Sequence, residues 1–448
     1  MTAYDTIFAL SSGPGRAGVA VFRLSGPQAR TALKALAGAL PAPRRAALRV
    51  LRDPADGTEI DRGLILWLPG PQSFTGEDMG ELHVHGSRAV AAALTAALAA
   101  LEGLRLAEPG EFARRAFENG RLDLTAAEGL ADLIDAETEA QRRQAVRQLE
   151  GAAGRLYDGW RDRLMRALAH FEAALDFADE ADVPGSLGEE VAAEAAAVVG
   201  EIARHLADGR RGERLREGLR VVIAGPANAG KSTLMNALAR RDVAIVSERA
   251  GTTRDVIEVH LDLSGYPVIL TDTAGLREAA DEIEEEGVRR ARQALDRADI
   301  LVWLDPADGT AAAPAPEPRH GQRLLRVRSK WDLRSDSPPR QGRDLSQLCL
   351  SVAKDWGVDA LVEQIAAAAR ELCGVGEDPA ISRARHRAAL EDCAAALARF
   401  AAAAKAGVST ELLAEELRLA ARALGRLTGR VDVEDLLDVI FADFCIGK

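Results

Sequence analysis

The chain of 448 residues is poor in aromatic side chains and in cysteine. Aromatic residues make up 4% of the chain, so its cores must consist mainly of Leu, Val, Ile and Ala. The four cysteines, at 349, 373, 393 and 445, are scattered and form no CxxC pair. This pattern predicts neither a disulfide framework nor a structural zinc site. The seven histidines show no metal-binding spacing, and we expect His83 and His85 to be structural or hydrogen-bonded.

Long apolar segments and an excess of positive charge are missing too. No run of 18 or more apolar residues occurs, and the first residues lack a secretory core, so we expect a cytoplasmic protein without a membrane span. The formal net charge of −12 argues against a protein that coats nucleic acid over its whole surface. A local basic patch remains compatible with it. The segment RRGERLREGLR, Arg210 to Arg220, is either such a patch or a solvated helix face.

The pattern of apolar residues changes three times along the chain. Strand and helix signals alternate up to about residue 120, with a hairpin turn at 53–57. Helical spacing follows, with a capping box at Thr125 and Glu128. Strands alternate with helices again between 218 and 374, and the rest is helical.

We therefore predict a multidomain protein with α/β and all-α parts. An N-terminal α/β domain covers 1–120, and a P-loop domain at 218–374 is inserted into a helical domain made of 121–217 and 375–448.

A phosphate-binding loop is predicted by VVIAGPANAGKSTLMNAL, which reads as a strand, a glycine-rich loop and a helix. Gly225 and Gly230 let backbone N–H groups surround a phosphate at the positive end of the helix dipole. Lys231 is expected to reach the β- and γ-phosphates, and Ser232 to bind Mg²⁺.

Two later motifs suit the same site. AGTTRD offers the hydroxyls of Thr252 and Thr253 to complete the Mg²⁺ shell when a γ-phosphate is present. ILTDTAGLRE ends a strand at Asp272, which is expected to hold Mg²⁺ through water, and Gly275 offers an N–H to the γ-phosphate. Three such motifs in this order indicate a nucleotide hydrolase.

The segment RVRSKWDL predicts guanine as the base, because Asp332 can accept two hydrogen bonds that adenine cannot donate. CLSVAK would add backbone N–H groups near Ser351–Ala353. Here the chain resembles a translation-factor-type GTPase. It departs from that pattern at Ser329, where an Asn usually braces both the base and the phosphate loop, and this departure predicts weaker GTP binding.

The usual water-orienting Gln is absent as well, because Leu276 follows Asp-Thr-Ala-Gly. Another group must therefore position water and offset the charge of the transition state. The side-chain oxygen of Asn228, with carbonyl groups of the SERAGTT loop, is suited to a monovalent cation beside the phosphates.

Together with the phosphate loop, four segments far apart resemble the MnmE (TrmE) family of tRNA-modification GTPases. They are DTIFALSSGPGRAGVAVFRLSG, SFTGEDMGELHVHG, GEFARRAFENGRLDL and the C-terminal CIGK. The resemblance implies a homodimer formed by the N-terminal domain, which binds a tetrahydrofolate derivative (the 5,10-methylene or 5-formyl form). It also implies an FAD-containing MnmG-type partner in a heterotetramer, potassium-stimulated GTP hydrolysis, and addition of a carboxymethylaminomethyl-type group to the wobble uridine of tRNA.

The resemblance assigns roles to individual residues. Glu284 positions the hydrolytic water, and Ser232 and Thr253 bind Mg²⁺. The potassium ligands fall on Asn228, Ser247, Arg249 and Thr252, and the folate contacts fall on Arg23, Glu81, Arg121 and Lys448. The full set expected to contact nucleotide is Asn228, Ala229, Gly230, Lys231, Ser232, Thr233, Ser247, Glu248, Arg249, Ala250, Gly251, Thr252, Thr253, Asp272, Thr273, Ala274, Gly275, Lys330, Asp332, Ser351, Val352 and Ala353.

Cys445, in the C-terminal segment DFCIGK, allows three interpretations. Prenylation is disfavoured, because Lys448 is a poor last residue for a prenylation box and the preceding segment is not polybasic. A nucleophile that adds to the uracil ring and a small packing residue remain open. The nucleotide motifs also leave open a ribosome-assembly GTPase and a GTP switch that only binds a partner.

Overall fold

A computed structural model describes residues 5–176, 187–208, 210–241, 243–245, 258–272, 293–309, 314–334, 348–374, 379–406, 408–431, 434–442 and 444–447. Its strands form two six-stranded sheets. Those of the first are β1 Thr6–Leu10, β2 Ala17–Ser25, β3 Ala47–Arg52, β4 Glu59–Leu68, β5 Met79–Gly86 and β6 Leu104–Leu106. Those of the second are β7 Leu219–Ala224, β8 Glu258–Leu263, β9 Tyr266–Asp272, β10 Ile300–Pro306, β11 Arg323–Ser329 and β12 Leu348–Cys349.

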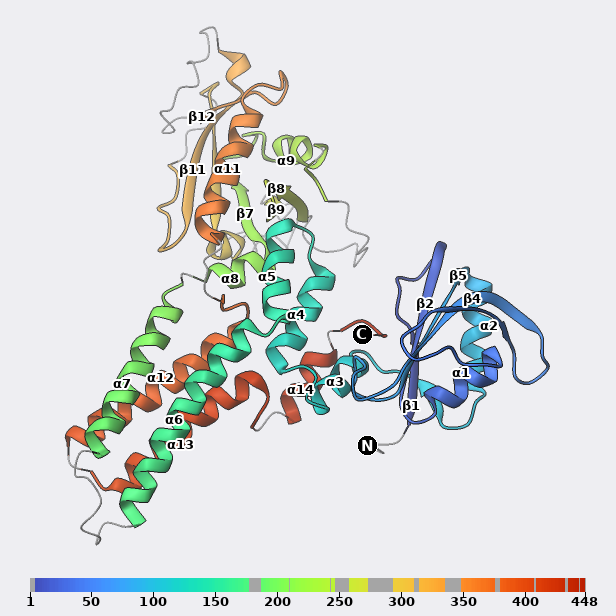
Figure 1. Cartoon of the computed structure of the whole chain (residues 1–448). Helices are drawn as coiled ribbons and strands as arrows, with labels where there is room; N and C mark the ends of the chain where they lie inside the picture. The colour runs from blue at the N-terminus through green and yellow to red at the C-terminus, as the bar shows by residue number, and fades with distance from the viewer. Residues whose placement is uncertain are drawn as a thin grey trace, which may run out of the picture. The chain divides into compact units, whose positions relative to one another are not determined.

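Helices dominate the remaining chain (Figure 1). Those before the second sheet are α1 Ala29–Ala37, α2 Arg88–Ala99, α3 Glu111–Glu118, α4 Leu124–Asp135, α5 Glu139–Leu149, α6 Ala152–Asp176, α7 Leu187–Leu206 and α8 Arg211–Glu217. The later ones are α9 Lys231–Ala239, η1 Trp331–Leu333, α11 Val358–Cys373, α12 Ala384–Lys405, α13 Thr410–Thr428 and α14 Glu434–Ala442. The predicted fold class, an N-terminal α/β part and helices interrupted by a second α/β part, is confirmed.

The chain divides into two compact units, and their limits fall within α4, α5, α6 and α13. Neither unit coincides with a predicted domain, and the four predicted boundaries stay predictions. The first unit comprises Met1–Ala131, Gln148–Asp162 and Ala421–Lys448, and the second comprises Asp132–Arg147 and Arg163–Ala420.

The first unit is built on the sheet with strand order β3-β4-β5-β2-β1-β6. Its strands alternate inward and outward residues, and the two faces bury different clusters. On β1, Phe8 joins the cluster formed with α1 and α2, whereas Ile7 and Ala9 join a cluster with Phe112 of α3. The hairpin predicted at 53–57 joins β3 and β4 in antiparallel register.

A buried carboxylate fixes the start of α3. Glu111 is 4% exposed and accepts hydrogen bonds from Arg105 at 2.6 and 2.8 Å, from Arg115 at 3.0 Å and from the Glu108 N–H at 2.9 Å. Burial favours the neutral acid, but these donors outweigh it and lower the pKa of Glu111. The ionised carboxylate therefore stabilises this unit at neutral pH.

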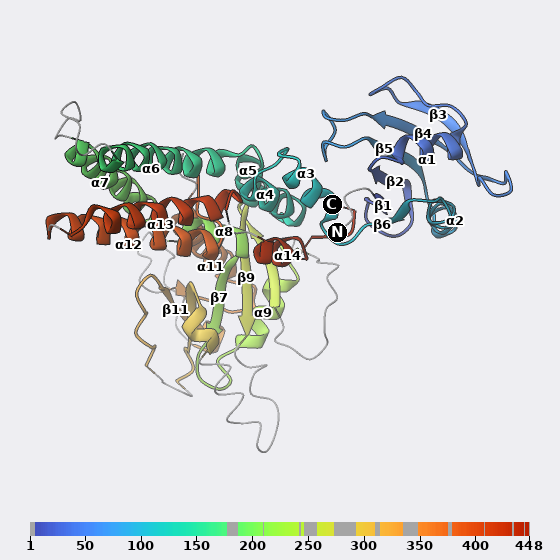
Figure 2. The ribbon, with the colours of Figure 1, turned by 90° about the horizontal axis from the view of Figure 1, so that it is seen from below.

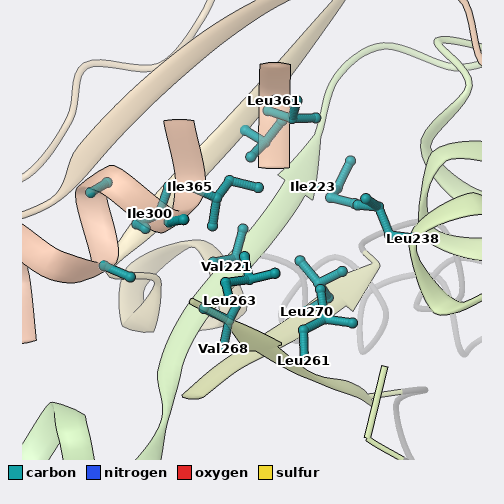
Figure 3. Packing of buried hydrophobic residues seen from close by; sticks show 14 of the residues in the cluster. Val221, Ile223, Leu238, Leu261, Leu263, Val268, Leu270, Ile300, Leu361 and Ile365 are labelled. Carbon is teal, nitrogen blue, oxygen red and sulfur yellow. The ribbon is translucent and has the colours of Figure 1, made fainter. Parts of the chain in front are cut away.

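The second unit contains the sheet with strand order β12-β11-β10-β7-β9-β8, in which only β8 is antiparallel to its neighbour. The strands lie within 218–374, where strands alternating with helices were predicted. The central strand β7 is buried on both faces, as parallel strands covered by helices are. Figure 3 shows Val221 and Ile223 of β7 packed with Leu270 of β9 and with Leu361 and Ile365 of α11.

Helices on either side of the inserted sheet pack together in the second unit. Helix α7 packs on α12 (Figure 2). Phe171 of α6 contacts Phe400 of α12 with ring centroids 6.2 Å apart. One oxygen of Asp132 accepts a bond from Arg216, before the insert, at 3.0 Å and from Arg383, after it, at 2.8 Å. Both connections of the insert are thus attached to one carboxylate.

The capping box predicted at Thr125 and Glu128 is wrong. Helix α4 begins at Leu124, and its cap is Asp123, whose carboxylate accepts from the N–H of Ala126 at 2.9 Å and from the hydroxyl of Thr125 at 2.6 Å. Within the described ranges, no helix is both long and apolar enough to cross a membrane.

Candidate functional site

The loop between β7 and α9 has a backbone that requires glycine at two positions. Gly225 has φ +153°, and a Cβ atom there would lie 2.5 Å from the carbonyl oxygen of Leu304. Gly230, directly before α9, has φ +94°. Between them Asn228 adopts a left-handed conformation, φ +60°, and is exposed. This is the shape expected of a phosphate-binding loop.

Polar side chains predicted for the phosphates lie at the start of α9. The Lys231 ammonium donates to the carbonyl oxygens of Gly225 at 3.2 Å and Pro226 at 2.9 Å, so it lies folded along the loop. Ser232 and Thr233 are exposed in the first turn of the helix. An anion at this helix end would meet the backbone N–H groups of the first turn and the positive end of the dipole.

Ser329 braces the phosphate loop. It ends β11 and is 2% exposed, and its hydroxyl donates to the carbonyl oxygen of the fully buried Ala229 at 2.7 Å. The departure from Asn therefore keeps the contact with the loop. A serine is too short to contact the base in addition to the loop. The weaker GTP binding predicted from Ser329 therefore stays a prediction.

The predicted base-reading segment lies beside the same strand ends. Lys330 is left-handed, φ +55°, and its ammonium lies 3.3 Å from the Asp308 carboxylate. The backbone N–H of Trp331 donates to the carbonyl oxygen of Leu350 at 3.2 Å, and this bond joins the segment to the residue after β12. Asp332 is exposed, so the burial that base discrimination needs would have to come from the base itself.

The second base-contacting segment forms a turn before α11. Ser351 is buried and exchanges two backbone hydrogen bonds with Trp356, at 2.9 and 3.0 Å. Val352 is half-buried and Ala353 is exposed. The predicted phosphate and base residues that the structure describes thus surround one end of the sheet, at the carboxyl ends of its parallel strands.

In the first unit, Arg23 and Glu81 are cross-strand partners on β2 and β5. The guanidinium donates to one oxygen of Glu81 at 3.1 and 3.2 Å, and the His83 ring lies 3.2 Å from the other. Arg23 also lies over the rings of Phe74 and Phe112, 5.5 and 5.9 Å from their centroids. The pair of charges is therefore held rigidly against aromatic faces.

Arg121, the third predicted folate contact, is exposed and lies beside the loop before β5. A Cβ atom on Gly76 would be 3.4 Å from its Cγ. The loop is tied to the same segment, because Asn119 donates to the carbonyl oxygen of Thr75 at 2.7 Å.

The C-terminal segment packs on the N-terminal sheet, as predicted. Ile446 forms an antiparallel bridge with Pro109. Gly447, with φ +92°, lies so close to β1 that a Cβ atom would be 2.7 Å from the carbonyl oxygen of Leu10. Phe441 and Phe444 are buried behind it, with ring centroids 5.4 Å apart.

Comparisons with known proteins agree with this arrangement. The family model "GTP-binding protein TrmE N-terminus" matches residues 6–121, and the model "MnmE helical domain" matches residues 124–445. The chain is 58% identical to the tRNA modification GTPase MnmE of Parvibaculum lavamentivorans, over 99% of this chain and 100% of that protein. The MnmE proteins of a Methylobacterium species and of Paramagnetospirillum magneticum are 57% and 54% identical, each over 99% of this chain and 100% of the relative. The chain belongs to the MnmE family.

Two solved structures of FeoB G domains are also similar. The one from T. maritima is 20% identical over 34% of this chain and 98% of its own, with a TM-score of 0.23, and the one from Methanococcus jannaschii is 22% identical over the same shares with a TM-score of 0.24. These scores are low. The nucleotide-binding architecture of this MnmE-family chain rests on its own strand order and on its phosphate loop.

Several predicted residues lie outside the described residues, and their roles stay predictions. The side chain of Asp272 is among them, although its backbone ends β9. The others are Ser247, Glu248, Arg249, Ala250, Gly251, Thr252, Thr253, Thr273, Ala274, Gly275, Glu284 and Lys448.

Cys445 is exposed three residues after α14, which argues against a packing role. The other three cysteines are buried. Burial raises the pKa of Cys373 and of Cys393 to about 12, so both remain neutral thiols at physiological pH. The nucleophilic interpretation of Cys445 stays open in this MnmE-family chain.

Three residues of the first-unit site were not predicted. Phe74 and Phe112 lie against Arg23, and neither sequence neighbourhood signals this contact. His83 was expected only to be hydrogen-bonded, which is confirmed, as it is for His85 with Asp61 at 2.8 Å. His83 comes two residues after Glu81 on a strand, so both side chains lie on the same face, and this spacing could have placed His83 beside Arg23 and Glu81.

Proposed function

We propose that the chain is a potassium-stimulated GTPase that acts in tRNA modification. With an FAD-containing MnmG-type partner and a tetrahydrofolate one-carbon donor, it would place a carboxymethylaminomethyl-type group at C5 of the wobble uridine. Membership of the MnmE family supports the tRNA substrate. The observation that carries GTP hydrolysis is the phosphate loop held by Ser329 beside the predicted guanine-reading segment.

Phosphate binding would begin with an exchange of partners at Lys231. Its ammonium leaves the carbonyl groups of Gly225 and Pro226 and turns to the β- and γ-phosphates, whose charges are better acceptors. The N–H groups at the start of α9 hold the same phosphates.

The residues present suit the two metal ions. The exposed hydroxyl of Ser232 is a hard oxygen ligand of the kind Mg²⁺ prefers, and the exposed Asn228 offers an amide oxygen to K⁺. When bound, these ions offset the negative charge of the phosphates in the transition state. The remaining ligands, Thr253 for Mg²⁺ and Ser247, Arg249 and Thr252 for K⁺, are proposed from the family, as is water positioning by Glu284.

The folate donor is proposed to bind beside Arg23 and Glu81. Glu81 can accept from pterin N–H groups, and the exposed Arg121 suits the glutamate tail, as Lys448 would. The rings of Phe74 and Phe112 offer flat surfaces to a pterin. We further propose that the N-terminal domain forms a homodimer, that the partner completes a heterotetramer, and that the protein works in the cytoplasm.

Nucleoside analysis of tRNA from cells that lack this chain tests the proposal directly. We expect the wobble modification to disappear and to return when the gene is restored. Unchanged nucleosides would favour a ribosome-assembly GTPase or a GTP switch that only binds a partner.

A further inference from the structure

Arginines gather in a groove at the end of the second sheet opposite the phosphate loop. The groove has a volume of about 500 Å³ and is lined from four places: α8, the first residues of β7, and the residues that precede β10 and β11. Helix α8 precedes β7 and α9 follows it, so the two lie at opposite ends of that strand (Figure 1). A strand of this length separates the groove from the phosphate loop by roughly 17 Å.

Three of the four acids in this groove are paired with arginines that also line it. Asp299 accepts from Arg214 at 2.8 Å, and Asp296 pairs with Arg319 at 2.5 Å. Glu213 is 4% exposed and pairs with Arg210 at 2.5 Å.

Two arginines outside the lining also lie near acids of the groove, but each pairs more closely with an acid outside it, Arg387 with Asp208 at 2.8 Å and Arg216 with Asp132 at 3.0 Å. Arg387 lies 3.3 Å from Glu213, and Arg216 lies 3.6 Å from Glu217, the fourth acid of the groove. The five arginines of the lining therefore exceed its four acids by one charge.

Two cations of the groove are left over. Arg220 and Arg297 line it, and neither forms an ion pair with any residue in the described part of the chain. Arg297 is exposed and Arg220 is half-buried. In a chain of net charge −12, this local excess is contrary to the overall balance. A partly enclosed groove of surplus positive charge attracts anions.

We propose that this groove binds the phosphodiester backbone of tRNA. The inference rests on the proposed role in tRNA modification and adds a contact surface to it. One guanidinium group can donate two parallel hydrogen bonds to the oxygens of a phosphate. This suits a groove in which Arg220 and Arg297 have no ion pair among the described residues. A surface far from the phosphate loop leaves the nucleotide site free while tRNA is bound. The basic segment 210–220 is then part of a patch and not merely a solvated helix face.

The test compares two double variants of the full chain. Arg220→Gln with Arg297→Gln removes the surplus charge of the groove. Arg30→Gln with Arg326→Gln removes two exposed arginines elsewhere, which likewise have no ion pair among the described residues, and serves as the matched control. Binding of fluorescently labelled, unmodified tRNA is followed by anisotropy over a series of salt concentrations.

Loss of two phosphate contacts should weaken binding at low salt and reduce the slope of log K against log salt by about 2. The control should keep the wild-type slope, and both variants should keep wild-type GTP turnover. An unchanged slope in the groove variant, or an equal change in the control, overturns the proposal. So does displacement of tRNA from wild type by inorganic phosphate at constant ionic strength, since that outcome marks a small-anion site.

Different outcomes would contradict the proposed function and the proposed groove. If cells that lack the chain keep their tRNA modification and the wild-type protein does not bind tRNA, the proposed function is wrong. If wild type binds and modifies tRNA but the groove variant does so equally well, only the groove is wrong.

Discussion

Removing the hydroxyl of Ser329 should weaken nucleotide binding without changing the choice of base. Ser329→Ala leaves the Ala229 carbonyl oxygen without its donor at a position that is fully buried. In the free protein the loop can relax and let water replace the hydroxyl. Nucleotide binding requires the phosphate loop to return to its original conformation, so the lost hydrogen bond lowers the affinity for nucleotide.

The size of this effect follows from the contact. A buried carbonyl group that loses a hydroxyl donor costs about 1 to 2 kcal/mol. This corresponds to a roughly 5- to 30-fold higher Kd. Because Ala229 belongs to the phosphate loop, GDP and GTP should weaken together. Ser329→Asn keeps an amide donor for Ala229 and adds a group that reaches the base, so it should tighten GTP binding by about 1 kcal/mol.

Competition titrations against a fluorescent guanine nucleotide measure both changes. Ser382→Ala, which removes a buried hydroxyl without a hydrogen-bond partner among the described residues, is the control and should bind like wild type. If Ser329→Ala binds GDP and GTP as tightly as wild type, the hydroxyl does not brace the loop and the reasoning is refuted.

Four further outcomes are expected. GTP turnover should rise strongly when K⁺ replaces Na⁺ at fixed ionic strength, and Glu284→Ala should lower turnover with little change in GTP binding; equal rates in the two salts would exclude the cation site. Asp332→Asn should shift preference towards xanthosine triphosphate in binding assays, because an amide N–H can face the second carbonyl group of that base. Deleting residues 445–448 should spare GTP hydrolysis and abolish tRNA modification, whereas Cys445→Ser should abolish modification and retain folate binding only if the thiol is a nucleophile. Glu111→Gln should destabilise the first unit by about 3 kcal/mol at pH 7 in denaturant titrations; since the folded pKa is lowered, this difference should shrink as the pH falls below about 4.5, where the unfolded wild-type chain takes up a proton first, and should be smallest below the folded pKa.

The strands and the phosphate loop were predictable because their causes are local. The central strands β7 and β10 contain short apolar runs, and the loop needs glycine at Gly225 and Gly230 for its own backbone. The predicted cap of α4 was wrong because two local interpretations competed. Thr125 and Asp123 can both cap a helix, and only the start of the helix decides that Asp123 does so.

Contacts between distant segments could not be predicted from the sequence. Ser329 and Ala229 are 100 residues apart, and the GTPase pattern indicated a contact between position 329 and the phosphate loop but not that a serine would keep it through Ala229. The arginine groove joins α8 to residues that precede two later strands, so the sequence could only leave the segment 210–220 with two interpretations. Packing of the C-terminal segment on β1 was anticipated from the family resemblance, not from local pattern.

Both connections of the inserted sheet are attached to Asp132, and this bears on how the insert could have entered the helical domain. Since Arg216 and Arg383 contact the same oxygen atom, the points where the chain enters and leaves the insert are neighbours in space. A gene for a free-standing hydrolase with adjacent ends could therefore be spliced into a helical host without pulling the host helices apart. By the same geometry, replacing the insert with a short glycine-rich linker should leave a helical protein that still folds.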